Sequence, residues 1–490
     1  MKIRFWMSLV IMFLVLTACA PVMAAPTETP TQTTPAENTS SPIIIQSPTE
    51  EPTATFTPEA TPTTEPLTLE QQLTEYLKTN VAQKSIDQFV NTFQLDAETT
   101  ELVRNNLTIN EITAKDGQQY EIALASVPQE NIPSENQKYA DLYQNIPLMI
   151  AEKNSNGEWE WDEATLGKIA AKQGMLVGSN YRSEESTESK ITLEQFNLSF
   201  IDGNASKLRN IHPGKDIFSI NGLIAEIKNA SLTGNPIIVH NLILGEKLDD
   251  KRVTWDDKMT KEEIIQEAVV EHLTKIVGAE GIKGNVFAYT FNEPGSAEDK
   301  LWQANPDYLR IAAETIRIYD PNAKIILNIP ENFNLNAKYG DNNPKLTSRL
   351  AIELYEVGLI DVVGIQGHIF GATPPTDQQI EAAFNRFKTP VGVQIPIWIT
   401  ELDVNMKGVN DPSFQKQAII IEKVVKKIIE LGCRVINNWE IGDKNSWLEE
   451  PPFKGRSSPD ANGTLFDDNL QPKPSYFTFL RALFQANSND

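Results

Sequence analysis

The chain has 490 residues, of which 40% are hydrophobic and 22% charged, as in ordinary globular proteins. This length allows two to four domains, or one large barrel with additional segments. The formal net charge of −23 argues against a nucleic-acid partner, because an acidic protein repels phosphate backbones. Two cysteines cannot form a disulfide framework. The only long apolar run lies at the N-terminus, which excludes a polytopic membrane protein.

The N-terminus is typical of a bacterial export signal. A short basic start precedes the apolar run 10–16, and Leu16-Thr17-Ala18-Cys19 resembles a lipobox. We predict a signal peptide over residues 1–18 and lipidation of Cys19, with the lipid anchoring the chain to a membrane at the cell surface. The alternative is an ordinary secretory signal with an incidental cysteine, which gives a secreted protein. Cys433 lies in an apolar stretch, and we expect it to be buried and inert.

The next segment has the composition of a spacer. Residues 21–66 contain ten Pro, thirteen Thr and six Glu, without any Gly, Lys, Arg or Asp. Proline favours extended backbone, and glutamates repel one another. Such a segment cannot bury enough apolar surface to fold. We therefore predict a disordered, semi-rigid Pro/Thr-rich linker over residues 19–66.

Residues 67–160 indicate a small accessory region of mixed structure. Apolar spacing predicts a helix over 69–77, and residues 119–126 read as a strand. No recognisable chemistry appears here, so an accessory or capping role is the favoured interpretation. Trp159 and Trp161 alternate, which suits either a glycan-binding module or the packed face of a strand.

From residue 161 to 490, short apolar runs alternate with longer helical stretches, for example helices over 307–319 and 411–431. Eight β–α repeats favour an α/β fold of the (β/α)8 TIM-barrel type. An open doubly wound sheet is the alternative, weakened because no glycine-rich phosphate loop follows the first strand. The predicted strands are 175–179, 198–201, 236–240, 286–291, 324–328, 361–366, 396–400 and 434–439.

Polar and aromatic residues recur where these strands end. In a TIM barrel the catalytic groups come from the C-terminal ends of strands. Each residue alone could be a helix cap or a satisfied core residue, but the recurrence around one rim indicates a site. The candidates are Asn204, Lys207, His240, Asn292, Glu293, Asn328, Gln366, His368, Glu401, Trp439 and Trp447.

Two carboxylates stand out among them. Glu293 ends the fourth predicted strand and Glu401 ends the seventh, and these strands face each other across a barrel mouth. Two carboxylates facing a cleft can split a glycosidic bond, one as proton donor and the other as nucleophile. Their environments must push their pKa values apart for both roles to operate at one pH.

The region from about residue 166 to 484 resembles glycoside hydrolase family 10, the barrel endo-β-1,4-xylanases, and looks like a divergent member on a bacterial lipoprotein. The order and spacing of several motifs carry this resemblance. They are Asn292-Glu293, Gly364-Ile365-Gln366-Gly367-His368, Ile399-Thr400-Glu401-Leu402-Asp403, Trp439 through Gly442-Asp443-Lys444-Asn445-Ser446-Trp447-Leu448, and Leu465-Phe466-Asp467-Asp468-Asn469-Leu470-Gln471-Pro472-Lys473-Pro474.

The resemblance implies roles for these residues. Glu293 would be the general acid and then the base, and Glu401 the nucleophile of a retaining double displacement. Asn292 would bind the 2-hydroxyl of the sugar at the cleavage point. Gln366 and His368 would position Glu401 and that sugar, with His368 neutral near pH 7 unless a carboxylate raises its pKa. His240, Asn204 and Lys207 match substrate-binding motifs of the second and third strands, and Trp439 and Trp447 would form an apolar floor under a sugar ring.

The sequence also departs from the family pattern. Gly203, Leu208 and Leu244 stand where the family has an acidic residue and two tryptophans, and Ala288-Tyr289 replaces its Trp-Asp pair. Losing a buried hydrogen bond to a sugar hydroxyl costs roughly 1–3 kcal/mol. We therefore expect a working glycosidase with weakened or altered specificity, for which xylan is the best single substrate. Tyr289 could also change the pKa of the acid/base residue.

Three function classes follow. The favoured one is a surface-anchored retaining glycoside hydrolase that acts on xylan or a related β-glycan. We expect it to be a monomer and to need no cofactor. The others are a weakly or non-catalytic glycan-binding lipoprotein and a structural or transport lipoprotein unrelated to sugars. Four scattered histidines offer no metal-ligand spacing, although a calcium ion near Asp467-Asp468 stays open.

Overall fold

The computed structural model describes residues 67–183, 186–202, 206, 208–243, 259–295, 299–330, 333, 344–448 and 461–486. The predicted signal peptide, Cys19 and the linker lie outside these residues. So do four positions singled out above, namely Gly203, Asn204, Lys207 and Leu244. In the described part of the chain, no helix is long and apolar enough to cross a membrane.

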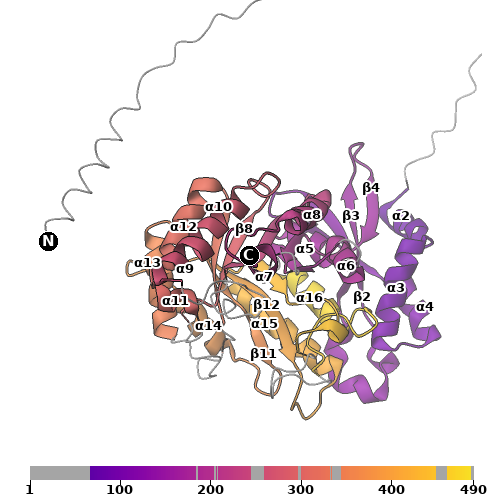
Figure 1. Ribbon diagram of the computed structural model, residues 1–490. Coiled ribbons are helices and arrows are strands. Elements are labelled where there is room, and N and C mark those ends of the chain that lie inside the picture. The colour runs from indigo at the N-terminus through magenta and orange to yellow at the C-terminus, as the bar shows by residue number, and fades with distance from the viewer. Residues whose placement is uncertain are drawn as a thin grey trace, which may run out of the picture. The chain divides into compact units, whose positions relative to one another are not determined.

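The accessory region is an antiparallel sheet with helices packed on it (Figure 1). The strands pair in the order β1-β2-β3-β4, and β2 and β3 are almost fully buried. The helix and the strand predicted here are confirmed as α2 and β2. The elements are α2 (Leu69–Tyr76), α3 (Asn80–Phe93), α4 (Ala97–Asn105), β1 (Thr108–Thr113), β2 (Gln119–Ala125), β3 (Ile146–Lys153) and β4 (Trp159–Glu163), with 3-10 turns at Gln129–Asn131 and Ser134–Tyr143.

The two tryptophans of β4 are structural in this region. Trp161 is 8% exposed and belongs to the apolar core. Trp159 is half-buried, and the Lys153 ammonium lies 4.9 Å from its ring centroid. Residues two apart on a strand lie on the same face, and both rings pack against the apolar core there. They therefore do not form an exposed platform for a sugar.

Eight parallel strands close into a barrel, as the sequence predicts. Hydrogen-bonded neighbours follow chain order from β5 to β10, then β12 and β13, and β13 pairs with β5. A short strand, β11, extends the edge of β12 and was not predicted. The strands are β5 (Leu176–Tyr181), β6 (Leu198–Ile201), β7 (Ile237–Ile243), β8 (Ala288–Asn292), β9 (Lys324–Ile329), β10 (Val362–Ile365), β11 (His368–Phe370), β12 (Ile397–Asn405) and β13 (Val435–Asn438).

Helices between the strands form the outer layer of the barrel (Figure 1). Those predicted over 307–319 and 411–431 are confirmed as α12 and α15. The helices are α5 (Leu166–Lys172), α6 (Thr187–Gln195), α7 (Leu208–Ile211), α8 (Asn221–Ala230), α9 (Lys261–Ile265), α10 (His272–Val277), α11 (Lys300–Ala304), α12 (Tyr308–Tyr319), α13 (Pro344–Glu356), α14 (Asp377–Asn385), α15 (Phe414–Glu430) and α16 (Pro474–Gln485), with 3-10 turns at Ser231–Thr233 and Asp443–Asn445 and a π-helical turn at Gln266–Glu271.

Alternate residues of each strand fill the barrel interior, because successive side chains of a strand point to opposite faces. Space there is short beside Gly364, where a Cβ atom would lie 2.7 Å from Asn328 Oδ1 and 2.9 Å from Thr400 Cγ2. Glycine at this position therefore leaves room for two polar side chains above the apolar layer. That layer comprises Leu198, Phe200, Ile238, Ala288, Ile326, Val362, Trp398, Val435 and Trp439.

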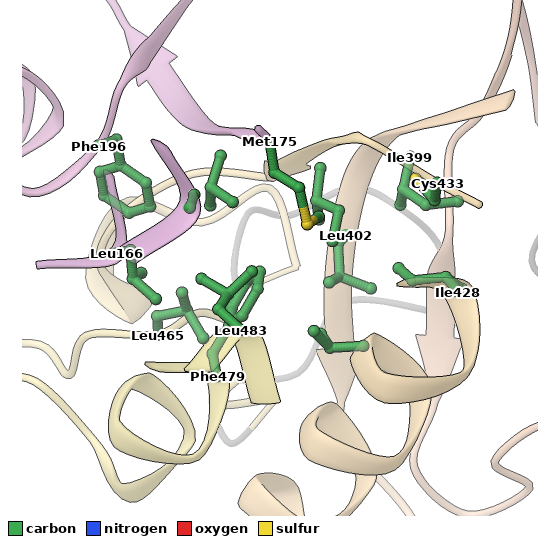
Figure 2. Close-up of a cluster of buried hydrophobic side chains, with 14 of the residues drawn as sticks. Leu166, Met175, Phe196, Ile399, Leu402, Ile428, Cys433, Leu465, Phe479 and Leu483 are labelled. Atoms are coloured by element: carbon green, nitrogen blue, oxygen red, sulfur yellow. The ribbon is translucent and has the colours of Figure 1, made fainter. Parts of the chain in front are cut away.

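A second apolar layer lies between the strands and the helices. Figure 2 shows part of it, where Met175, Leu402 and Cys433 meet side chains of α15 and α16. Cys433 is buried, as expected, and donates to the Val435 carbonyl at 3.2 Å. Burial raises the pKa of its thiol to about 11, which keeps it unreactive near neutral pH.

The second apolar layer continues into the accessory region, and all described residues belong to one compact unit. Phe89 and Phe93 of α3 lie 5.7 and 5.8 Å, centroid to centroid, from Phe477 of α16. Arg481 of α16 donates to both carboxylate oxygens of Glu422 at 2.8 and 2.6 Å and to the Gln144 carbonyl at 2.8 Å. One buried guanidinium thus links α15, α16 and the accessory region.

We predict that Arg481→Met lowers the free energy of unfolding by about 3 kcal/mol, because it leaves a mostly buried carboxylate without its main partner. Lys426 still pairs with Glu422 at 2.8 Å, which limits the loss. Denaturant unfolding measures it. The control is Lys78→Met, which breaks the exposed Lys78–Glu75 pair and should cost less than about 0.5 kcal/mol. Equal losses in both variants would contradict the prediction.

Candidate active site

Register between parallel strands brings the predicted polar residues together at the C-terminal end of the barrel. Asn292 of β8 is the pairing neighbour of Asn328 of β9, which is in turn the neighbour of Gly364 of β10. Asn328 Nδ2 donates to Asn292 Oδ1 at 2.6 Å and to Glu401 Oε1 at 2.7 Å. Its Oδ1 accepts the Thr400 hydroxyl. Asn328 therefore joins three strands through one amide group.

Glu401 lies at the centre of this cluster and is only 5% exposed. Its Oε2 is 3.1 Å from His368 Nε2, and its Oε1 is 3.8 Å from His240 Nε2. Consecutive residues of a regular strand face opposite ways, yet Thr400 and Glu401 both reach Asn328. The pairing of β12 with β13 shifts register between Ile399 and Leu402, and such an irregularity re-aims a side chain.

His368 is fixed from both ring nitrogens. Nδ1 lies 2.9 Å from Asp403 Oδ2 while Nε2 faces Glu401. The same Asp403 oxygen accepts Trp447 Nε1 at 2.8 Å, and the Trp447 ring lies 4.8 Å from the His368 ring. The sequence places Asp403 in a motif without indicating a role for it, and the structure shows that it orients His368.

The pKa values of His368 and Glu401 are shifted in opposite directions. Burial opposes a charged ring, but the charges and hydrogen bonds of Asp403 and Glu401 prevail and raise the pKa of His368 well above its usual value. Burial likewise opposes ionisation of Glu401, but the hydrogen bond from His368 and the nearby His240 and Asn328 lower its pKa. Asp403 and Glu401 thus keep His368 protonated near pH 7. His368, His240 and Asn328 in turn favour the ionised form of Glu401.

Glu293 ends β8 in the left-handed region, with φ of +50°. Its N–H donates to the Asn328 carbonyl at 2.9 Å, and its side chain is half-buried. Gln366 Nε2 donates to Glu293 Oε1 at 2.7 Å. The side chain of Gln366 therefore contacts Glu293, whereas the expectation was Glu401. Gln366 touches Glu401 through its carbonyl, which accepts the Glu401 N–H at 2.8 Å.

His240 and Trp439 form the aromatic side of the site. His240 Nδ1 lies 3.0 Å from the Thr290 hydroxyl, and its ring packs 5.1 Å from Phe200 and 5.4 Å from Trp439. Trp439 is 9% exposed, so most of its surface belongs to the barrel interior, whereas Trp447 is half-buried. Both rings pack on the histidines beside Glu401, Trp439 on His240 and Trp447 on His368.

The departure at Ala288-Tyr289 divides between two faces of β8. Ala288 is fully buried in the interior apolar layer. Tyr289 points the other way, and its hydroxyl donates to Asp320 Oδ2 at 3.1 Å. The hydroxyl of Tyr289 is therefore bound to Asp320 on the face of β8 that points away from the barrel interior.

Among the described residues, no group of three His, Cys, Asp or Glu side chains is arranged to hold a metal ion. Asp467 Oδ1 accepts the N–H groups of Asn469 and Gln471 at 2.8 and 2.9 Å. Its side chain thus stabilises its own turn.

A model of glycosyl hydrolase family 10 matches residues 165–482, more than half of the chain. Endo-1,4-beta-xylanase 5 of Pyricularia oryzae is 28% identical over 263 residues, which cover 49% of this chain and 60% of that protein. Endo-1,4-beta-xylanase A of Caldicellulosiruptor saccharolyticus is 28% identical over 330 residues, covering 61% and 89%. Native xylanase 10B from Thermotoga maritima superposes with a TM-score of 0.57 and 22% identity, over 66% of this chain and all of that one.

The barrel and its paired carboxylates define the class as a glycoside hydrolase. The chain belongs to glycosyl hydrolase family 10. The match spans about 60% of the length of the Pyricularia relative, and the structural likeness establishes the barrel fold.

We predict that His368→Gln moves the acidic limb of the kcat/KM profile to higher pH. Removing the protonated ring raises the pKa of Glu401. A Glu401 that acts as an ionised carboxylate then loses activity sooner as pH falls. The lost donor should also lower kcat by about 10²-fold. Hydrolysis of an aryl β-glycoside across pH measures both effects.

The matched control is His212→Gln, which alters another fully buried histidine, one that faces Glu267 at 3.1 Å. It should leave the acidic limb in place. An unmoved limb in His368→Gln would show that this ring does not govern ionisation of Glu401.

Proposed function

We propose that this protein is a retaining endo-β-1,4-xylanase with Glu293 as acid/base and Glu401 as nucleophile. The observation that carries the proposal is the set of contacts on Glu401, a buried carboxylate held by Asn328 at 2.7 Å and His368 at 3.1 Å, which lower its pKa. Gln366 links it to the second carboxylate, because its carbonyl accepts the Glu401 N–H and its amide donates to Glu293. An ionised, fixed carboxylate is what attack on an anomeric carbon requires.

The reaction then runs in two displacements. Glu401 attacks the anomeric carbon while the bond to the leaving oxygen breaks, and Glu293 donates its proton to that oxygen. A glycosyl ester on Glu401 results. Glu293, now ionised, takes a proton from water, whose oxygen displaces Glu401 and restores both residues. Gln366, on Glu293 at 2.7 Å, orients the carboxyl that changes protonation state twice.

Xylan as the substrate rests on resemblance. The relatives described above carry the name endo-1,4-beta-xylanase, and a xylanase 10B from Thermotoga petrophila with similar fold is a complex with xylobiose. The changes at Gly203, Leu208 and Leu244 favour a weakened or shifted β-glycan specificity, so this chain would be a divergent member. Ala288 lies in the apolar layer of the barrel interior, beneath the site.

A glycan-binding lipoprotein that captures sugars without cleaving them is the second candidate, motivated by the same altered motifs. The two differ in turnover, because a capture protein binds an activated aryl glycoside and releases no phenol. A structural or transport lipoprotein, the third candidate, would show neither. The polar cluster around Glu401 favours the first.

We predict that Glu401→Ala lowers kcat on xylan and on an aryl β-xyloside by at least about 10⁴-fold, with folding retained. Azide provides a sharper measurement, because it can enter the space left by the carboxylate. It should restore release of the aryl group from Glu401→Ala and yield the α-glycosyl azide. In Glu293→Ala it should attack the glycosyl ester and yield the β-azide.

Products of the same configuration from both variants would overturn these roles. Reducing-sugar release from mixed-linkage glucan or cellulose instead of xylan would keep the mechanism and change the substrate. Binding of xylan without any release by the unaltered protein would favour the capture protein.

The proposed location is the outer face of a membrane, through a lipid on Cys19 followed by the 19–66 linker. We predict that Cys19→Ser moves the activity from the membrane fraction to the medium without loss of specific activity. Fractionation of cells that produce each form measures this. Ala18→Gly, which keeps a small residue before the cysteine, serves as control and should remain anchored. Membrane retention of Cys19→Ser would reject the lipobox.

A further inference from the structure

Glu440 is a buried acidic residue that the proposed reaction does not use. It follows Trp439 at the end of β13, is 5% exposed, and has φ of +66°. This left-handed conformation favours glycine and is strained for other residues. Neighbouring groups must therefore hold Glu440 in place.

Those groups come from β5, the strand that pairs with β13. The Glu440 N–H donates to Asn180 Oδ1 at 3.2 Å, and its carbonyl accepts the Ser179 hydroxyl at 3.3 Å. The backbone of Glu440 is thus tied to the first barrel strand, and its side chain has a defined direction.

Both carboxylate oxygens of Glu440 are used. Oε1 pairs with the guanidinium of Arg182, just after β5, and Oε2 accepts the backbone N–H of Trp447 at 2.6 Å. The Arg182 side chain is 36% exposed, so this pair lies where the barrel meets solvent. A mostly buried ion pair is weak evidence for stability, which directs attention to what its geometry fixes.

What it fixes is Trp447. The residue is held at two points, by Glu440 at its backbone and by Asp403 at its indole Nε1, 2.8 Å away. The same Asp403 oxygen holds His368, which faces Glu401. A displacement of the Trp447 backbone would therefore move the ring beside the nucleophile and disturb the contact that orients His368.

We propose that Arg182 and Glu440 are positioning residues for the glycosidase reaction, acting through Trp447. Neither contacts the reacting atoms. They set the indole ring against which the sugar joined to Glu401 packs, and they keep its N–H on Asp403. This inference rests on the proposed function, because it assigns roles around the same nucleophile.

A double-mutant cycle tests it, with kcat and KM measured on an aryl β-xylobioside for Glu440→Ala, Trp447→Ala and the double variant. Glu440→Ala should lower kcat/KM about 10- to 100-fold, as small misplacements do. The double variant should lie within about twofold of Trp447→Ala alone, because Glu440 has nothing left to position. Glu440→Gln keeps an oxygen for the Trp447 N–H and should lose at most about fivefold.

Additive losses in the cycle would overturn the proposal and leave Glu440 a structural residue. The matched control is Asp361→Asn, which weakens another partly buried ion pair, Arg317–Asp361 at 2.6 Å, next to the start of β10. It should change kcat/KM by less than about twofold even if it lowers stability. If Glu440→Ala does not fold, Arg182→Met takes its place in the cycle with the same two outcomes.

Failure of the proposed function has a different signature. The unaltered protein would then release no phenol from any aryl β-glycoside, and no cycle could be measured. Turnover by the unaltered protein together with additive losses would reject only the roles of Arg182 and Glu440.

Discussion

The site depends on keeping one carboxylate ionised inside a barrel. Burial alone would favour protonated Glu401, because a charge loses its hydration there. The protein reverses this preference with a neutral amide from Asn328 and a protonated ring, His368, whose own charge is maintained by Asp403. Glu401, His368 and Asp403 thus form one electrostatic unit, in which the ionisation of Glu401 and the protonation of His368 depend on each other.

Barrel geometry supplies the members of that unit from separate strands. Parallel register sets Asn292 beside Asn328, and Gly364 leaves the space that Asn328 and Thr400 occupy. The irregular pairing of β12 then brings Glu401 to the same amide as Thr400. Below this polar level the interior is apolar, so the hydrogen bonds above it form in surroundings of low dielectric, where they are strengthened.

The barrel and the position of its site could be predicted from the sequence, because apolar runs mark the strands and the ends of the strands mark the rim. All eight barrel strands fall in this class, whereas the contact of His368 with Glu401 was expected from the resemblance to the family motifs. The partners of side chains could not be predicted in this way, because Gln366 lies between two carboxylates and the sequence does not say which one its amide reaches. Alternation on β8 turns Tyr289 outward to Asp320, a partner that the motif alone does not reveal. The core shared with the accessory region depends on long-range packing of Phe89, Phe93 and Phe477, which leaves no local signal.

The same alternation explains how the chain departs from family motifs without losing its central chemistry. On β8, Ala288 lies inside the barrel and Tyr289 outside it, while Thr290 and Asn292 continue up the interior face and contact His240 and Asn328. A substitution at 288 or 289 is therefore one or two residues from the site in sequence but acts on a different layer. Changes of this kind alter packing around the barrel and leave the carboxylates and their partners in register. Changes in packing around the barrel and retention of the contacts of Glu401 are for this reason physically separable in this fold.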